Sequence, residues 1–261
     1  MQIMSSLKDK IWLWGQTPNG HHRSGYPLPG ENKMTPTEAL DFFGIKNNCR
    51  VKLNFEPELS FFDDPYLANE NTEKICLSVL GAGGEIVELN DTDAVIALSK
   101  KEPRIVAAVM DDLIGTKRIN VYTAEVIRGI RERLHNEPDN PIELWSVFYD
   151  TDLSKPISDK AREFDVTTYW NWFGESLYSL DEDVKKMREI ADGGRIMLGM
   201  YMFDYGNKKP YSDSDMKMQI DLMQRKLEDG EIEGIILCSN CIADIGLSAV
   251  DITKKWLDEL K

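Results

Sequence analysis

The chain has 261 residues, of which 42% are hydrophobic and 29% charged. This composition is that of an ordinary globular protein and excludes collagen-like, disordered and disulfide-scaffold classes. The 31 Lys and Arg residues against 45 Asp and Glu residues give a net charge of −14. Nucleic acids and anionic membrane surfaces attract positively charged proteins, so we expect neither as a partner. The length suits one large α/β domain spanning residues 1–261.

The sequence carries no evident targeting or membrane segment. No uncharged apolar stretch approaches the ~20 residues of a membrane-spanning helix, and the N-terminus MQIMSSLKDK lacks the apolar core of a signal peptide. Four cysteines are too few for a disulfide framework. We therefore expect a cytoplasmic protein with buried free thiols at Cys49, Cys76, Cys238 and Cys241.

Short apolar runs recur along the chain, each followed by a polar loop and most by an amphipathic segment. Their hydrophobicity is continuous, which is typical of strands buried on both faces of a parallel sheet. The runs cover residues 10–16, 50–56, 74–81, 104–112, 142–150, 165–173, 195–206 and 232–244.

Helices are expected between the runs. The first opens at Thr35, with Pro36 at its first position and Glu38 completing a capping box. Strong amphipathic patterns predict further helices over residues 123–137, 180–194, 212–231 and 247–261. Weaker helical or connecting patterns cover residues 61–73, 89–103 and 158–164.

This alternation predicts a single (β/α)8 TIM barrel, a fold of about 250 residues. The main alternative is a doubly wound sheet, whose first turn usually carries GxGxxG. The first turn here, GQTPNGHH, lacks that motif. The lone G-A-G-G at residues 81–84 is a weak phosphate signal and favours a tight turn.

The ends of the runs differ in character. Acidic and aromatic residues follow the runs, whereas Lys10, Arg50, Lys74, Arg104 and Arg195 mark their starts. In a TIM barrel the chemistry lies at the C-terminal ends of the strands. The sequence therefore predicts an acidic, aromatic mouth at that end.

Paired carboxylates suggest a specific reaction. Cleavage of a glycosidic bond requires one carboxylic acid to protonate the leaving oxygen and one carboxylate to act as nucleophile or base. Runs four and seven end on nearly opposite sides of an eight-strand ring, so we expect their acids to face each other. We assign Asp111 or Asp112 as general acid, Asp204 as nucleophile or base, and Glu56 as a supporting carboxylate. The alternative for each Asp is a cap on the following helix.

Flat aromatic rings pack against the C–H faces of sugars while their polar edges stay hydrated. The expected substrate-binding residues are Trp14, His21, His22, Tyr149, Trp170, Trp172, Tyr205 and Asn240.

We expect no cofactor and no bound metal. Three His residues are too few for a His-rich metal site. A carboxylate site for Mg²⁺ or Mn²⁺ formed by Glu56, Asp112 and Asp204 is the alternative. Cys238 and Cys241 lie in one predicted strand, where this spacing directs them to opposite faces, so neither a zinc nor a redox role is expected.

Several motifs together resemble one known family. They are W-x-W-G-Q followed by H-H, LPG-x-x-x-x-TPTEA, VMDD, YMFDYG and IEGIILCSNCIADIGLSAVDITKKWL. Across nearly the whole chain they are similar to an uncharacterised bacterial TIM-barrel, glycoside-hydrolase-like family. The resemblance implies the barrel and a carbohydrate-active superfamily, without a defined reaction. Established barrel glycosidases of the largest clan carry Glu at the ends of strands four and seven, where this chain has Asp.

The sequence therefore predicts a carbohydrate-active barrel that hydrolyses or binds a small-molecule or oligosaccharide glycoside. Two alternatives belong to other classes: a non-catalytic sugar-binding barrel, and a metal-dependent sugar isomerase or epimerase. A carboxyl separation of about 5–5.5 Å would favour a retaining hydrolase and one of about 6.5–9.5 Å an inverting hydrolase.

Overall fold

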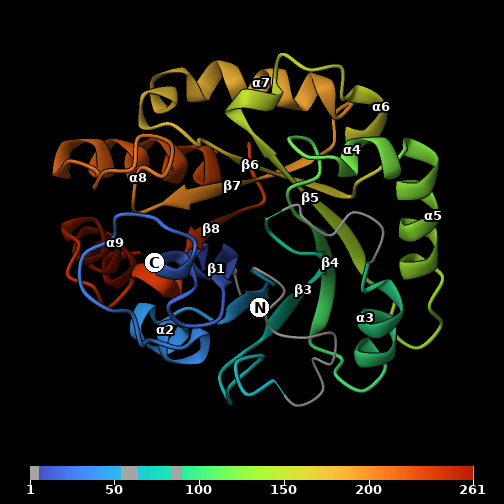
Figure 1. Ribbon diagram of the computed structural model, residues 1–261, viewed down its shortest axis with the longest axis horizontal. Coiled ribbons are helices and arrows are strands. Elements are labelled where there is room, and N and C mark those ends of the chain that lie inside the picture. Colours follow the sequence, from blue (N-terminus) through green and yellow to red (C-terminus); the bar gives the residue numbers. More distant parts are fainter. Residues whose placement is uncertain (1–5, 54–63, 84–89, 261) are drawn as a thin grey trace, which may run out of the picture.

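The computed structural model describes residues 6–53, 64–83 and 90–260. In these ranges, parallel strands β1 to β8 close into a barrel in chain order, with β8 hydrogen-bonded to β1 (Figure 1). The predicted (β/α)8 TIM barrel is confirmed. The strands are β1 (Ile11–Gly15), β2 (Asn47–Arg50), β3 (Lys74–Leu80), β4 (Ile105–Met110), β5 (Glu143–Tyr149), β6 (Val166–Trp170), β7 (Arg195–Tyr201) and β8 (Gly234–Cys238).

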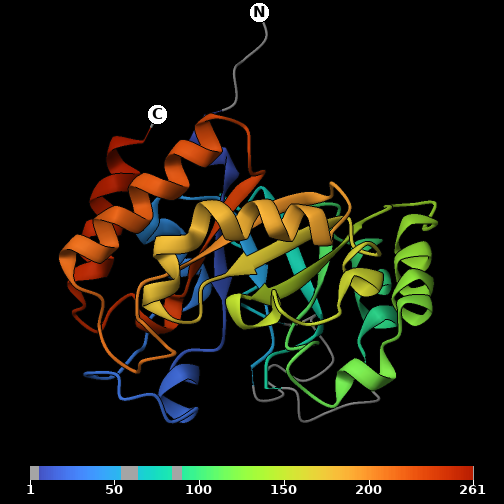
Figure 2. The same cartoon turned by 90° about the horizontal axis from the view of Figure 1, so that it is seen from above.

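Helices surround the strands (Figures 1 and 2). The longer ones are α2 (Pro36–Phe43), α3 (Thr92–Ser99), α5 (Ala124–His135), α7 (Leu180–Ile190), α8 (Asp213–Glu228) and α9 (Ser248–Glu259). Short helical turns are η1 (Leu7–Lys10), α1 (Gly20–Arg23), α4 (Arg118–Val121), η3 (Asp150–Asp152), α6 (Ser158–Ala161), η4 (Gly174–Ser179) and η5 (Asn240–Ile242). Within the described ranges, none of the helices is both long and apolar enough to cross a membrane.

The capping box predicted at Thr35 is confirmed. Thr35 caps α2 by accepting the backbone N–H of Glu38, and the Glu38 carboxylate accepts the backbone N–H of Thr35. By contrast, the described part of the weaker segment, residues 64–73, forms turns.

Strand β2 begins three residues before the predicted run, at Asn47 instead of Arg50. Its first two residues are buried amides whose side chains bind backbone carbonyls. Asn47 Nδ2 donates to the carbonyls of Asp9 and Ile11 at 2.8 and 3.0 Å. Asn48 Nδ2 donates to two carbonyls of the β2–β3 connection. Because these bonds satisfy the side-chain N–H groups, the strand tolerates amides among its buried residues.

The shifted strand also corrects the position of Arg50, which was expected at the opposite mouth. Arg50 is the last residue of β2 and its side chain is 1% exposed. Its guanidinium donates from Nε to Asp64 at 2.5 Å and from Nη1 to the Gly15 carbonyl. A buried Arg needs such partners, since an uncompensated buried charge is costly.

Tryptophan side chains fill the barrel interior in two layers. Trp12 packs edge-on against Trp145 with ring centroids 5.0 Å apart, and Trp14 packs against Trp170 at 5.2 Å. Gly199 in β7 lies directly against the Trp170 indole, where any Cβ would overlap the ring. Strand β7 therefore requires a residue without a side chain at this position.

We expect Gly199→Ala to lower the free energy of unfolding by about 1–3 kcal/mol or more, because the indole must leave its packed position. The matched control is Gly129→Ala in α5, where an added Cβ meets nothing within 4 Å. That change should raise stability by about 0.5–1 kcal/mol through helix propensity. Urea unfolding of both variants measures the two effects. Equal stabilities for the two would contradict the packing described here.

Candidate active site

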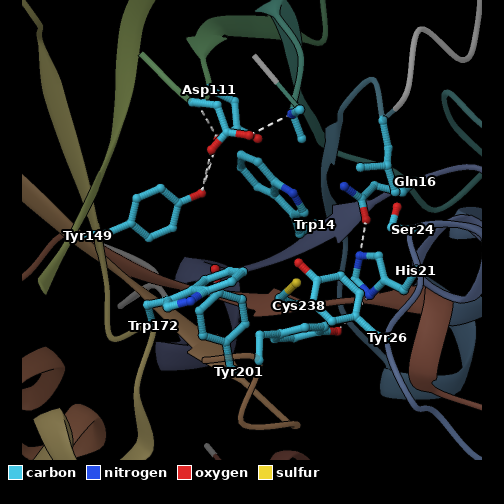
Figure 3. A pocket seen from close by; sticks show the side chains of 15 residues that line it. Trp14, Gln16, His21, Ser24, Tyr26, Asp111, Tyr149, Trp172, Tyr201 and Cys238 are labelled. Atoms are coloured by element: carbon cyan, nitrogen blue, oxygen red, sulfur yellow. Dashed lines mark hydrogen bonds between the residues drawn. The ribbon is translucent and has the colours of Figure 1, made fainter. Parts of the chain in front are cut away.

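A pocket of about 200 Å³ opens at the C-terminal ends of the strands (Figure 3). Strands β1, β4, β5, β7 and β8 each contribute residues at or close to their carboxyl ends: Trp14, Asp111, Asp112, Tyr149, Tyr201 and Cys238. The loops that follow the strands add Gln16, His21, Ser24, Tyr26, Leu53, Ala82, Gly83, Trp172 and Tyr205. The predicted mouth is thus a real cavity, acidic on one side and aromatic on the other.

Asp111 and Asp112 immediately follow β4. The backbone of Asp111 remains bound to β3, donating its N–H to the Leu80 carbonyl at 3.0 Å. Asp112 then turns into the left-handed region with φ of 47°. Asp is among the residues that tolerate this conformation. The turn brings both carboxyl groups into the pocket.

The two carboxyl groups have one hydrogen-bond partner in common and one backbone N–H donor each. Asp111 Oδ1 accepts the backbone N–H of Asp112 at 2.7 Å. Asp112 Oδ2 accepts the backbone N–H of Gly83 at 2.6 Å. The Tyr149 hydroxyl, from the end of β5, lies 3.1 Å from Asp112 Oδ1 and 3.4 Å from Asp111 Oδ1. Tyr149 therefore bridges the pair.

The pocket shifts the ionisation of these groups. Burial and the neighbouring charge of Asp112 raise the pKa of Asp111 well above its usual range, although the Arg118 guanidinium opposes this. Burial and both carboxylates likewise raise the pKa of Tyr149 far above its ordinary value. Two carboxylates in one site disfavour double ionisation, which favours the protonated form of Asp111.

His21 lies in the middle of a buried hydrogen-bonded row. Its Nδ1 accepts the Tyr205 hydroxyl at 2.6 Å, and its Nε2 donates to Gln16 Oε1. The Gln16 oxygen can only accept, which places the ring proton on Nε2. Burial, with a smaller contribution from His22, lowers the pKa of His21 to about 3. His21 is therefore a neutral residue that orients Tyr205.

Aromatic rings form the wall away from the acids (Figure 3). Trp172 stacks on Tyr205 with centroids 6.0 Å apart and an interplanar angle of 24°. Tyr205 also contacts Tyr26 and Tyr201 edge-on at 4.8 and 5.0 Å. These rings present apolar faces with hydroxyl groups at their edges. Such a surface suits the C–H faces and hydroxyls of a sugar.

Asp204 was expected to face the β4 acids, but it does not line the pocket. Strand β7 ends at Tyr201, and Asp204 lies three residues further on in a tight turn. Its carboxylate accepts the backbone N–H and the side-chain Nδ2 of Asn207 at 3.0 and 2.8 Å. Asp204 is 2% exposed and holds this turn together. Glu56 lies outside the described residues.

Trp14, His21, Tyr149, Trp172 and Tyr205 line the pocket as expected. The other predicted binding residues lie elsewhere: Trp170, His22 and Asn240. Trp170 is 2% exposed and packs beneath Trp14. Asn240 is fully buried and its side chain binds backbone groups of Gln16 and Met34. Nε2 of His22 lies 3.4 Å from the Pro29 carbonyl.

All four cysteines are free and buried, as predicted. The reason offered for Cys238 and Cys241 was wrong, because only Cys238 belongs to β8 while Cys241 lies in η5. Cys238 lines the pocket. Burial raises the pKa of its thiol well above the usual range, so it is present as the neutral thiol.

Sequence reasoning missed several lining residues, chiefly Tyr201, Tyr26 and Cys238. Tyr201 and Cys238 are the last residues of β7 and β8, so the strand-end rule would have found them had the strand boundaries been known. Tyr26 lies in the loop between α1 and α2 and carries no comparable signal.

In the described ranges, the His, Cys, Asp and Glu side chains form no group of three that could hold a metal ion. The alternative metal site depends on Glu56, outside those ranges, and on Asp204, which is occupied in its turn.

The sequence matches no protein-family model and no curated protein. Solved structures do match. A glucosidase from Croceicoccus marinus has a TM-score of 0.54 and 10% identity, over 97% of this chain and 68% of that one. A beta-glucuronidase of Faecalibacterium prausnitzii has a TM-score of 0.51 and 10% identity, over 87% and 45%. The aldolase QR15 has a TM-score of 0.50 and 11% identity, over 98% of both chains. These similarities agree with the TIM-barrel fold.

The lowered pKa of His21 predicts a specific acid sensitivity. Below about pH 6.5 the unfolded chain binds a proton at this residue, whereas the native state binds it only near pH 3. Between these values protonation favours the unfolded chain. The free energy of unfolding therefore decreases as the pH is lowered, by up to about 1.4 kcal/mol per pH unit. We expect His21→Gln to remove this component. Urea unfolding of both proteins from pH 7 to 4 measures the difference in slope, and parallel profiles would contradict the prediction.

Proposed function

We propose that the protein hydrolyses glycosides in this pocket, with Asp111 and Asp112 as its catalytic carboxyl groups. The observation that carries the proposal is a site in which two adjacent carboxyl groups, one of them with a raised pKa, share a pocket with an aromatic wall. A carboxylic acid that stays protonated near neutral pH is suited to donate a proton to a glycosidic oxygen. The aromatic wall would hold the sugar ring beside it.

The hydrogen bonds suggest separate roles for the two acids. Asp112 accepts one backbone N–H at Oδ2 and the Tyr149 hydroxyl at Oδ1, so both of its oxygens serve as acceptors. Oδ1 of Asp111 is occupied by the Asp112 backbone N–H, which leaves Oδ2 to carry the proton. Asp111 would therefore act as general acid and Asp112 as the anionic partner. Tyr149, which contacts both carboxyl groups, would hold them in position relative to each other.

The size of the pocket favours a small ligand. Its volume of about 200 Å³ lies below the ~300–1,000 Å³ of sites for drug-sized molecules. We infer that one sugar unit is bound inside and that the rest of the glycoside projects outward. Such a site would release single sugars from chain ends.

The position of Asp204 favours a second candidate, sugar binding without hydrolysis. A barrel that lost the facing carboxylate could keep the aromatic wall as a binding surface. Turnover separates the two, because a binding protein would take up a monosaccharide without cleaving any glycoside.

Asp111→Asn should lower kcat on a hydrolysed 4-nitrophenyl glycoside by about 10²–10⁴-fold, the usual contribution of a general acid. The melting temperature should stay unchanged or rise. The pKa of Asp111 is raised in the folded state, so ionisation of this group destabilises the fold as the pH rises through that pKa. The neutral amide of the variant cannot ionise and therefore avoids this destabilisation. Steady-state kinetics and thermal denaturation at pH 7 measure both effects. Retained activity with a lower melting temperature would contradict the catalytic role.

Asp204→Asn provides the matched comparison, with the same change of a buried acid just beyond a strand. Its carboxylate accepts two hydrogen bonds within its turn, so the variant should lose about 1–3 kcal/mol of stability. The kcat of the folded fraction should fall far less than in Asp111→Asn. A loss of kcat as large as that of Asp111→Asn would restore the facing-carboxylate mechanism.

A further inference from the structure

Among the residues that the structure describes, the acids of the pocket come from one side of the barrel. Asp111 and Asp112 follow β4, and in the closed ring of eight strands β8 lies opposite β4. The facing side carries Cys238 from β8, Tyr201 from β7 and Trp14 from β1 (Figure 3). A sugar bound between the two sides would have carboxyl groups on one side and aromatic rings on the other.

The groups of the facing wall are held in neutral forms. Burial raises the pKa of Tyr201 and of Cys238 well above their ordinary values. Burial and the nearby acids raise the pKa of Tyr26 to about 12. Both ring nitrogens of His21 are engaged in hydrogen bonds. This wall therefore supplies apolar contact and hydroxyl groups, but neither a phenolate nor a thiolate.

Hydrolysis with a covalent or cyclic intermediate requires a nucleophile at the anomeric carbon. In some glycosidases the substrate supplies this nucleophile itself. On the basis of the proposed function, we infer that the pocket selects 2-acetamido-2-deoxy sugars and that their acetamido carbonyl oxygen attacks the anomeric carbon. The acids of β4 then both act from the same side, one on the leaving group and one on the acetamido N–H.

The step balances with the groups present. The acetamido oxygen forms a bond to C1 as the bond from C1 to the leaving oxygen breaks. Asp111 gives its proton to the leaving oxygen. Asp112 accepts a hydrogen bond from the acetamido N–H and offsets the positive charge of the cyclic oxazolinium intermediate. Water then attacks C1, its proton returns to Asp111, and the ring bond to the acetamido oxygen breaks. The product sugar retains its anomeric configuration.

The aromatic wall suits the remaining atoms of the substituent. The acetamido methyl group is apolar, and Trp172, Tyr205 and Tyr201 enclose an apolar corner of the pocket. Tyr149 also contacts Trp172, with centroids 5.7 Å apart, so this corner lies next to the acids. A 2-hydroxy sugar would leave the corner unfilled and Asp112 without its N–H donor.

The test compares 4-methylumbelliferyl 2-acetamido-2-deoxy-glycosides of gluco and galacto configuration with their 2-hydroxy counterparts. We expect kcat/KM to favour one acetamido sugar by about 10⁴-fold, the discrimination of a site that binds a substrate N–H. Replacing the acetyl group by trifluoroacetyl should lower kcat/KM at least about tenfold, because the carbonyl oxygen becomes less nucleophilic. A sugar-fused thiazoline, which mimics the cyclic intermediate, should raise the melting temperature.

The variants assign the two acids. With a 2,4-dinitrophenyl leaving group, which departs without protonation, Asp111→Asn should retain most of its kcat/KM. Asp112→Asn should lose at least about 100-fold with the same substrate, since the N–H is no longer held by a charge. Equal losses in the two variants on this substrate would overturn the assignment.

Two outcomes overturn the inference while leaving the proposed function intact. One is Asp111-dependent hydrolysis of 2-hydroxy glycosides at a rate equal to or above that of acetamido sugars. The other is a covalent adduct with a 2-deoxy-2-fluoro glycoside on any carboxylate, Glu56 included, detected by mass spectrometry of the intact protein. If no glycoside of either class is cleaved or bound, the proposed function fails as well.

Discussion

Two carboxyl groups on the consecutive residues that follow β4 disfavour each other's ionisation in a small cavity lined by aromatic rings. This constraint determines the character of the site. Burial and the neighbouring Asp112 raise the pKa of Asp111, and burial together with both acids raises the pKa of Tyr149. The backbone N–H of Gly83 and the guanidinium of Arg118 supply the compensating positive potential. The site therefore places an acid with a raised pKa in an open cavity.

The remaining polar groups of the pocket are arranged to stay neutral. Three side chains form a hydrogen-bonded row: the Tyr205 hydroxyl binds His21, and His21 binds Gln16. Such a row rigidifies the wall without adding charge. With the overall charge of the chain at −14, further negative charge inside the cavity would be unfavourable. The only described acids that line the pocket are the β4 pair.

Most of the fold was predictable because seven strands are continuous apolar runs, the pattern of strands buried on both faces. The start of strand β2 was predicted wrongly because its first two residues are Asn47 and Asn48. Their burial depends on side-chain hydrogen bonds, which a hydrophobicity pattern cannot indicate. The β4 acids could be placed at the pocket because they directly follow the strand. The position of Asp204 was predicted wrongly. Met202 and Phe203 continue the apolar run, although the strand pairing of β7 has already ended at Tyr201.

The buried amides of β2 also determine how its neighbours are aligned. A slip of one residue would turn every side chain of the strand to the opposite face, and neither amide would then meet its carbonyls. The alignment extends beyond the strand, since the carbonyl of Lys52 binds the N–H of Ala82 at 3.0 Å. Gly83, the next residue, donates to Asp112. Correct strand alignment during folding thus positions the backbone N–H that binds the Asp112 carboxyl group, and the polar residues of β2 link assembly of the barrel to the geometry of the pocket.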